Sequence, residues 1–389
     1  MSNREPVWTV GDLPFTFKPL TSPHNPNGLP DRLPFRIRVN RRSGTFVQDA
    51  DPAVSSFLAR AYSLGSTITG QMDDEGIGRG YADDFLNFIM GQRELSTFRG
   101  KRVLEVGCGN GFLLHQLATH GADVIGIDPG DHAKSKYDVP IIRDFFPSRR
   151  IAGKFDTIIG FAMLEHVEDP ERFLQELFTL LAPGGDILLG VPDCGPYLAA
   201  GDISCLFHEH WSYFDGESLA RTVRGAGGIT VDVSAGRFGG MLFARVTQDS
   251  EQDRGTEVQD QLDTAEQLVA FRKRAEHAID VVTRYFFAAR VAGEAVGVYV
   301  PGRIVNALCA GNVAIENCRF FDDSPLLKAS YYPGIPVPVE NRGDLIAHPP
   351  DRVLIMSRSF GNLIANELRE QLPARVQITG WDELFASAA

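Results

Sequence analysis

Two imidazoles and a carboxylate follow one another in the middle of the chain, as His208, Glu209 and His210. Trp211 and Tyr213 add an indole and a phenol directly after them. Together these side chains offer a general base, a group that orients it, and aromatic walls that exclude water. The segment therefore predicts acid–base catalysis, with His210 as the base.

A metal site and a purely structural cluster are the alternatives for this segment. All three of His208, Glu209 and His210 are possible ligands, but on a strand the two imidazoles share one face and the carboxylate points to the other. The spacing of helical zinc peptidases is also absent. We therefore expect no metal ion.

A second set of residues is typical of a cofactor site. Glu105 ends a predicted strand, and Gly107-Cys108-Gly109-Asn110-Gly111 precedes a predicted helix. Glycines allow a ligand to approach the backbone N–H groups of such a turn and the helix N-terminus. A dinucleotide-binding turn has its third glycine one position later, where this chain has Phe112. The spacing favours a nucleoside with an amino-acid tail over NAD.

Two carboxylates follow the turn where a nucleoside would need them. Asp128, beside Pro129, ends the next predicted strand, and a carboxylate there can accept hydrogen bonds from both hydroxyls of a ribose. Asp144 and Phe145 follow the next short apolar segment, where an acid can accept the adenine amino group beside an aromatic wall. An ordinary loop carboxylate is the alternative for Asp144.

Alternating strand and helix patterns must position these residues. In the first half of the chain, strands are predicted at 102–106, 124–128, 155–160 and 185–191, with helices at 112–118 and 170–181, and a last strand at 238–246. Strand–helix alternation predicts an α/β fold with a doubly wound, Rossmann-like core.

A second run of the same kind follows a long amphipathic helix. Apolar residues spaced by three and four predict that helix, as Leu268, Phe271, Ala275, Ile279, Val282 and Phe286. Strands are then expected at 296–300, 319–323, 352–356 and 375–379, with a helix at 303–310. The expected domains are 1–70, small and N-terminal; 71–247, the core; 248–294, a helical connection; and 295–389, a second Rossmann-like domain.

Composition excludes several classes of function. A net charge of -12 argues against a nucleic-acid partner, because such affinity depends on clustered Lys and Arg. The beginning of the sequence lacks a secretory signal, and no stretch reaches the ~18 apolar residues of a membrane span, so we expect a cytoplasmic protein without membrane contact. Five cysteines, an odd number without a Cys-x-x-Cys pair, predict neither disulfides nor a structural zinc site.

The glycine turn and its strand, Val103-Leu104-Glu105-Val106-Gly107-Cys108-Gly109-Asn110-Gly111, resemble the first motif of class I S-adenosylmethionine-dependent methyltransferases. Segments 155–160 and 180–185 look like the later motifs of that family. The resemblance implies S-adenosylmethionine as the cofactor. By family analogy Phe161, Ala162, Glu165 and His166 border its adenosyl and methionine parts, and His166 shapes the pocket.

Three further segments narrow the resemblance. The His-Glu-His-x-x-Tyr-Phe segment, 237–243 and 332–338 look like C-methyltransferases that act on nucleotide-linked keto-deoxysugars. Such proteins join an N-terminal zinc-binding region, a methyltransferase core and a C-terminal Rossmann-like domain. The resemblance implies a small-molecule keto substrate. Glu209 and His210 would serve deprotonation of the carbon next to the ketone, with Tyr213 or Tyr62 donating a hydrogen bond to the enolate oxygen.

The chain departs from that family at three places. The four zinc-ligand cysteines are missing from residues 1–60, and Phe207 stands where the family has a tyrosine. The Gly-Tyr-Gly-Ala-x-x-Lys-Gly stretch of the C-terminal domain is altered at 297–303 and lacks its lysine. An O- or N-methyltransferase, and a non-catalytic S-adenosylmethionine-binding assembly protein, are therefore the alternative functions. The oligomeric state is left open.

Overall fold

The computed structural model describes residues 6–63, 72–73, 75–92, 95–130, 137–248, 263–357 and 360–386. By their contacts the residues divide into two compact units, each assembled from separate stretches of the chain. The first unit contains Arg38–Pro196 and His210–Glu266, and the second contains Val7–Ile37, Tyr197–Glu209 and Gln267–Ala389. The four contiguous domains expected from the sequence stay a prediction.

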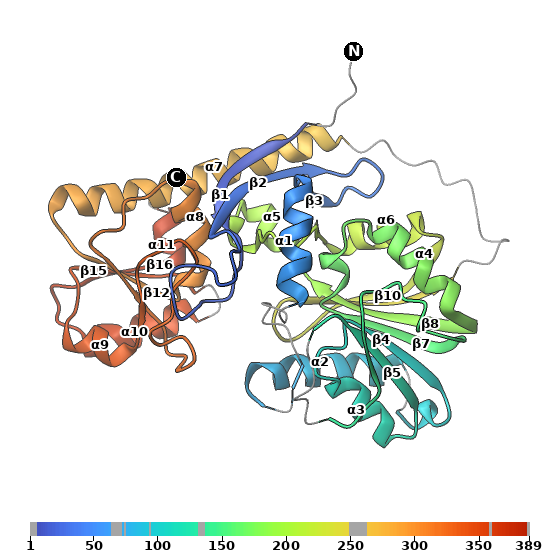
Figure 1. The fold of residues 1–389 in the computed structure, drawn as a ribbon. Coiled ribbons are helices and arrows are strands. Elements are labelled where there is room, and N and C mark those ends of the chain that lie inside the picture. The colour runs from blue at the N-terminus through green and yellow to red at the C-terminus, as the bar shows by residue number, and fades with distance from the viewer. Residues whose placement is uncertain are drawn as a thin grey trace, which may run out of the picture. The chain divides into compact units, whose positions relative to one another are not determined.

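A seven-stranded sheet forms the centre of the first unit, with strand order β10-β11-β8-β7-β4-β5-β6 (Figure 1). β11 is antiparallel to both of its neighbours, and the other pairings are parallel. The strands are β4 (Arg102–Val106), β5 (Asp123–Asp128), β6 (Ile141–Arg143), β7 (Phe155–Phe161), β8 (Leu181–Pro192), β10 (Gly228–Ala235) and β11 (Met241–Gln248). The strand order reverses between β4 and β7, and ligands of open α/β sheets bind outside the carboxyl ends of the strands at such a point.

Helices cover this sheet because each buries an apolar face. α4 begins at Pro170, where the Asp169 side chain caps the helix by accepting a hydrogen bond from the backbone N–H of Arg172. Its Leu174 and Leu177 are fully buried. The helices are α1 (Pro52–Ser63), α2 (Gly76–Gln92), η1 (Leu95–Phe98), α3 (Phe112–Thr119), η2 (Leu164–His166), α4 (Pro170–Leu180) and α6 (Gly216–Gly225). A short antiparallel pair, β3 (Phe46–Gln48) with β9 (Ser212–Tyr213), completes the unit.

The second unit contains a five-stranded parallel sheet with strand order β14-β13-β12-β15-β16. Its strands are β12 (Val296–Tyr299), β13 (Cys318–Phe321), β14 (Val339–Glu340), β15 (Arg352–Ile355) and β16 (Gln377–Gly380). β1 (Trp8–Pro14) and β2 (Arg32–Val39) form an antiparallel pair. The helices are η3 (Ile203–Cys205), α7 (Thr264–Ala292), η4 (Pro301–Arg303), α8 (Val305–Ala310), α9 (Arg342–Ala347), α10 (Gly361–Gln371) and α11 (Trp381–Ala386), and α5 (Gly195–Ala200) crosses the boundary between the units along the chain.

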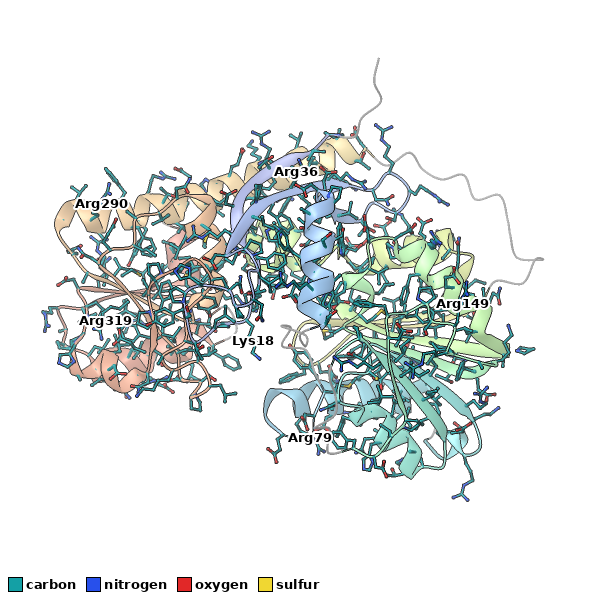
Figure 2. The ribbon with its side chains drawn as sticks, in the orientation of Figure 1. Lys18, Arg36, Arg79, Arg149, Arg290 and Arg319 are labelled. Atoms are coloured by element: carbon teal, nitrogen blue, oxygen red, sulfur yellow. The ribbon has the colours of Figure 1, made fainter. Side chains whose placement is uncertain are left out.

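The apolar stripe of α7 packs as the sequence predicts. Leu268, Phe271, Ala275, Val282 and Phe286 are buried, whereas the labelled Arg290 lies on the exposed side of this long helix (Figure 2). The doubly wound α/β core is likewise confirmed. Among the described helices, none combines the length and apolar character that crossing a membrane requires.

Two local expectations were wrong. The last strand of the first sheet begins at Met241 and not at residue 238, because Gly239 and Gly240 adopt left-handed conformations (φ 68° and 65°) that a strand excludes. His208 and Glu209 form a turn and not a strand, so the alternation of side chains along a strand does not apply to them.

Candidate active site

A cavity of about 550 Å³ lies in the first unit, beside the carboxyl ends of β4, β5 and β7. A volume of this size is typical of sites for cofactors and small substrates. The lining residues are Ser55, Leu58, Ala59, Tyr62, Met72, Glu105, Val106, Gly107, Cys108, Gly109, Asn110, Phe112, Leu113, Ile127, Asp128, Pro129, Asp144, Phe145, Phe146, Phe161, Ala162, Met163, His166, Val167, Glu168, Phe173 and Trp211. The structure thus brings most of the predicted cofactor residues to one cavity.

The glycine turn requires glycine for two reasons. Gly107 and Gly111 have φ of 73° and 80°, in the left-handed region that costs other residues energy. A Cβ atom on Gly107 would lie 2.9 Å from Cγ of Met163, and one on Gly111 would lie 2.5 Å from Cγ2 of Val139. Ala162, which also lines the cavity, holds a φ of 47° without being glycine. Backbone strain of this kind clusters at functional sites.

Two carboxylates border the turn. Asp128 accepts hydrogen bonds from the backbone N–H groups of Gly109 (3.0 Å) and Gly130 (2.8 Å), and a carboxylate keeps further lone pairs for ribose hydroxyls. Glu105 is 2 % exposed, and its Oε2 has no hydrogen-bond partner among the described residues. Burial and the nearby Asp128 raise the pKa of Glu105 well above its ordinary value. A cationic group bound beside Glu105 would oppose this shift and stabilise the charged carboxylate.

The predicted adenine-side residues lie where a ligand edge could meet them. Asp144 accepts hydrogen bonds from the Ser148 hydroxyl (2.6 Å) and from the backbone N–H of Phe145 (2.9 Å). These bonds, the Ser148 bond first, lower the pKa of Asp144, so the side chain is an anionic acceptor at neutral pH. Phe145 lines the cavity and is 45 % exposed, which leaves its ring available for stacking.

One residue at this site was missed by sequence reasoning. The Asp73 carboxylate accepts hydrogen bonds from Asn110 Nδ2 (3.1 Å) and from the Tyr137 hydroxyl (2.9 Å). It therefore joins the segment before α2 to the glycine turn and to the chain before β6. Apart from its charge, nothing in the sequence around Asp73 indicates this role.

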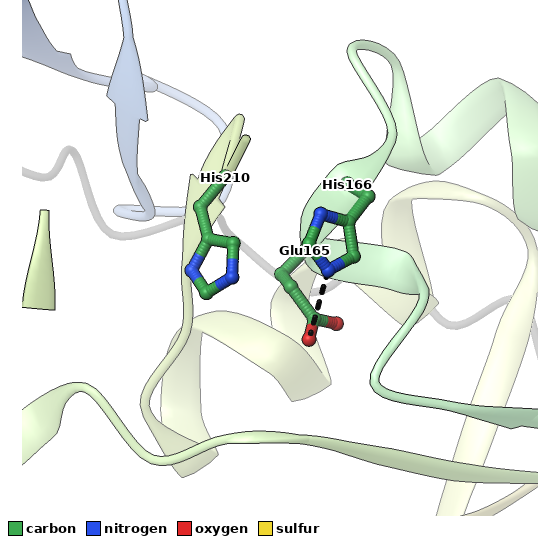
Figure 3. Close-up of side chains that lie close together, drawn as sticks. All are labelled: Glu165, His166 and His210. Carbon is green, nitrogen blue, oxygen red and sulfur yellow. Dashed lines mark ion pairs between the residues drawn. The ribbon is translucent and has the colours of Figure 1, made fainter. Parts of the chain in front are cut away.

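Glu165, His166 and His210 form a second cluster beside the cavity, shown in Figure 3. His166 Nε2 lies 3.6 Å from Glu165 Oε1, and the rings of His166 and His210 meet edge to face with centroids 4.7 Å apart. His166 lines the cavity, and the Tyr62 hydroxyl lies 3.3 Å from its Nδ1. Glu165 and His210 are not among the lining residues and support His166 from the protein side.

Backbone contacts fix this cluster in place. The N–H of Trp211 donates to the carbonyl of Glu165 (2.7 Å), which joins the chain before β9 to η2. The Tyr213 hydroxyl and Gln48 Nε2 both donate to the carbonyl of His210 (3.2 and 3.3 Å). Tyr213 is fully buried. Its hydroxyl, which the sequence predicts to donate to an enolate oxygen, here holds the backbone at His210.

Burial sets the charge of the cluster. It raises the pKa of Glu165 to about 8 and, together with the nearby His166, lowers the pKa of His210 well below its ordinary value. His210 is therefore a neutral imidazole at neutral pH, the form that can accept a proton or bind a metal. The ligand atoms of Glu165, His166 and His210 lie within 4.8 Å of one another, so these residues could hold a metal ion.

The structure separates His208 from this group. His208 belongs to the second unit, where it is fully buried between Phe15 and Phe35 and its Nε2 lies 3.1 Å from the carbonyl oxygen of Leu33. Glu209 is also assigned to the second unit and is 2 % exposed. Neither residue is among those that line the cavity of the first unit. The possible metal ligands thus include His210 but differ from the consecutive His208, Glu209 and His210 considered above.

Comparison with known proteins indicates which family the segment carrying this site resembles. Residues 77–228 match a family model described as "Methyltransferase domain". That segment is a methyltransferase domain. Its architecture and motifs are those of the class I type, and its cofactor is S-adenosylmethionine.

The curated relatives agree over part of their length. The chain is 37 % identical over 138 residues to a protein named ubiquinone biosynthesis O-methyltransferase from Psychrobacter cryohalolentis, covering 32 % of this chain and 51 % of that protein. It is 35 % identical over 109 residues to the protein of that name from Acinetobacter baylyi, covering 25 % and 46 %. The chain thus spans about half the length of the curated relatives it matches.

Parts of the chain also align with solved structures that are named methyltransferases. The magnesium protoporphyrin IX methyltransferase of Synechocystis with bound S-adenosylhomocysteine (SAH) is 19 % identical, with a TM-score of 0.37, 50 % of this chain covered and 94 % of that chain. The N-methyltransferase NodS of Bradyrhizobium japonicum is 19 % identical, with a TM-score of 0.38 and coverage of 51 % and 100 %.

Proposed function

We propose that the whole chain is an S-adenosylmethionine-dependent methyltransferase that methylates the carbon next to the carbonyl of a small keto metabolite, such as a nucleotide-linked sugar. The observation that carries the proposal is the buried His210, in ring contact with His166 at the wall of the cofactor cavity. Methylation of carbon needs a base for an α-proton, and a neutral imidazole is such a base.

The cavity fits the cofactor. Glu105, buried and with an oxygen that has no partner among the described residues, suits the ammonium group of the methionine part. Asp128 suits the ribose diol, and Asp144 with Phe145 suits the adenine. The cofactor supplies an activated methyl group on a sulfonium, so the protein need not activate the electrophile. The remaining task of the protein is to orient the acceptor and to remove its proton.

In the proposed reaction the proton reaches His210 by way of His166, which lines the cavity and is in ring contact with His210. Tyr213 and Gln48 hold the backbone of His210, so the imidazole is positioned before the substrate arrives. The Tyr62 hydroxyl faces the cavity beside His166 and would donate a hydrogen bond to the enolate oxygen. Of the two tyrosines considered for that role, Tyr62 is the better candidate because the Tyr213 hydroxyl already donates to a backbone carbonyl.

A pocket in the second unit suits a phosphate-bearing ligand. Arg274, His277 and Arg303 line this cavity of about 290 Å³ together with the rings of Trp381 and Phe385. Met356 and Trp381 of this lining directly follow β15 and β16, and Arg303 ends the short helix η4 after β12. These residues lie at the carboxyl edge of the sheet, where the strand order reverses between β12 and β15. Cationic side chains beside aromatic rings suit a nucleotide, although the lysine of the resembling family is absent here.

Methylation of oxygen is the second candidate. The relatives named O-methyltransferases favour it, since they match the segment that carries the cofactor site. If oxygen is the acceptor, His210 would remove a proton from a hydroxyl group of the substrate. The residues proposed to bind the cofactor would keep the same roles.

Hydrogen exchange separates the two candidates. The chain is incubated in D₂O with SAH, which cannot donate a methyl group, and with keto-sugar nucleotides and small keto acids. We expect deuterium next to the carbonyl of the true acceptor, and a rate lower by about 100-fold or more for His210→Ala, the range for losing a general base.

His120→Gln, a change at an exposed residue after α3, is the control and should exchange as the unchanged chain does. A methylated product that forms from S-adenosylmethionine without any exchange in SAH would overturn C-methylation in favour of the oxygen or nitrogen acceptor.

A further inference from the structure

Glu165, His166 and His210, the Glu/His trio, converge from two segments far apart in the sequence. Glu165 and His166 lie on η2, and His210 lies two residues before β9. Figure 3 shows the carboxylate and the two rings turned toward one another, and their ligand atoms all lie within 4.8 Å. Two ligands bound to zinc at about 2.0–2.2 Å stand about 3.5 Å apart in a tetrahedral site. The 3.6 Å between His166 Nε2 and Glu165 Oε1 already matches that separation.

Of the three residues, Glu165 destabilises the fold most, because its carboxyl group is buried with an oxygen that has no hydrogen-bond partner among the described residues. Its side chain is 2 % exposed, and its Oε2 accepts no hydrogen bond from any described residue. A buried polar oxygen without a partner destabilises the fold unless something in the site compensates. No lysine or arginine is recorded in an ion pair with Glu165 among the described residues. A bound cation would satisfy this oxygen and balance the charge of the carboxylate.

The donor atoms indicate the kind of cation. Two imidazole nitrogens and one carboxylate oxygen are the ligand set of many catalytic zinc sites and of other first-row transition metals. Magnesium and calcium prefer sites made of oxygen atoms.

We propose that Glu165, His166 and His210 bind a divalent transition-metal ion of the zinc type at the wall of the cofactor cavity. Two ligand atoms as much as 4.8 Å apart need a side-chain shift of about 1 Å to reach the separation of about 3.5 Å found between the ligands of a tetrahedral site. Three protein ligands leave a fourth position open, which can take a water molecule. Of the three ligands, only His166 lines the cavity.

The metal site does not depend on the identity of the acceptor, but it bears on the role of His210. The imidazole lone pair that binds the ion is the one needed to accept a proton. Metal loading and proton removal by His210 therefore exclude each other in one molecule.

Metal titration tests the site without any substrate. Tag-free, chelator-treated chain is titrated with Co²⁺ and followed by visible absorption, and with Zn²⁺ by calorimetry. We expect one ion per chain and the absorption of a four- or five-coordinate cobalt site, with affinity lower by about 100-fold or more for Glu165→Gln and for His166→Gln. Glu171→Gln, at a half-buried carboxyl group on α4 that pairs with Arg42, is the matched control and should bind as the unchanged chain does.

Absence of stoichiometric binding, or binding that Glu165→Gln leaves unchanged, would overturn the proposal. Far-UV circular dichroism and thermal unfolding of each variant show whether its fold is intact. Should a variant not fold, X-ray absorption of the zinc-loaded unchanged chain decides, because scattering from two imidazoles is expected and its absence contradicts the trio.

The effect of zinc on hydrogen exchange keeps this proposal distinct from the proposed function. With His210 as the base, zinc abolishes exchange and a chelator restores it. If zinc instead accelerates the reaction, the metal site stands and the role of His210 as base falls.

Discussion

At the scale of single residues, Gly107 is the position where a small change should matter most. Its φ of 73° and a cavity wall made by Met163 both exclude a side chain, whereas Gly184 has a similar φ of 74° with nothing within 4 Å of its would-be Cβ. The two glycines therefore separate backbone strain from collision at the cofactor site.

We expect Gly107→Ala to lose SAH binding, because the new Cβ would lie 2.9 Å from Met163 Cγ and would displace that side chain in the cavity. Gly184→Ala should lose about 1–2 kcal/mol of unfolding free energy from strain alone and keep its affinity for SAH. Calorimetric titration with SAH and thermal unfolding measure the two effects. Equal affinities of the two variants would contradict the importance of Met163 for the cavity.

At the scale of elements, the Asp73 carboxylate connects the segment before α2, the glycine turn and the chain before β6. Elements that enclose a ligand contribute to its affinity by being ordered in advance. Asp73→Ala should therefore weaken SAH binding by about tenfold, the equivalent of one or two hydrogen bonds.

Tyr137→Phe removes the bond to Asp73 and leaves the Asn110 bond in place, so its loss of affinity should be smaller than that of Asp73→Ala. Dissociation constants for SAH at one salt concentration provide the comparison. If Tyr137→Phe costs as much as Asp73→Ala, the connection to Asn110 contributes nothing.

At the scale of the whole molecule, His208 gives the stability of the fold a dependence on pH. Burial lowers the pKa of His208 to about 4, whereas a histidine in an unfolded chain titrates near about 6.5. Between these values the unfolded state binds the additional proton. The stability that comes from keeping His208 neutral in the fold is therefore present in full above about pH 6.5 and is lost as the pH falls toward about 4.

We expect the free energy of unfolding to decrease by up to about 3 kcal/mol through His208 alone as the pH falls through that range. In His208→Gln an amide nitrogen takes the place of Nε2 facing the carbonyl of Leu33. The glutamine side chain cannot titrate, so the free energy of unfolding of this variant should not show the part of the decrease that His208 causes. Urea unfolding from pH 7 to 4.5 measures the difference. His348→Gln, at an exposed histidine of the same unit, is the control, and parallel curves for His208→Gln and the unchanged chain would contradict the prediction.

The sequence by itself determined the elements and the cofactor turn. Strand and helix periodicity, the glycine spacing and Asp128 are local patterns, and local patterns follow from steric limits on the backbone and from which side chains are buried. The doubly wound core, the methyltransferase domain and the buried stripe of α7 could be predicted for that reason.

Only the tertiary structure decided which side chains meet at the reacting end. His210 was expected beside His208, yet these residues belong to different units, and His210 contacts His166 from a distant segment instead. The hydrogen bond from the Tyr137 hydroxyl to Asp73 likewise joins two segments that are far apart in the sequence. Such contacts depend on how β9 and η2 pack and where loops close, and no spacing along the chain records that geometry.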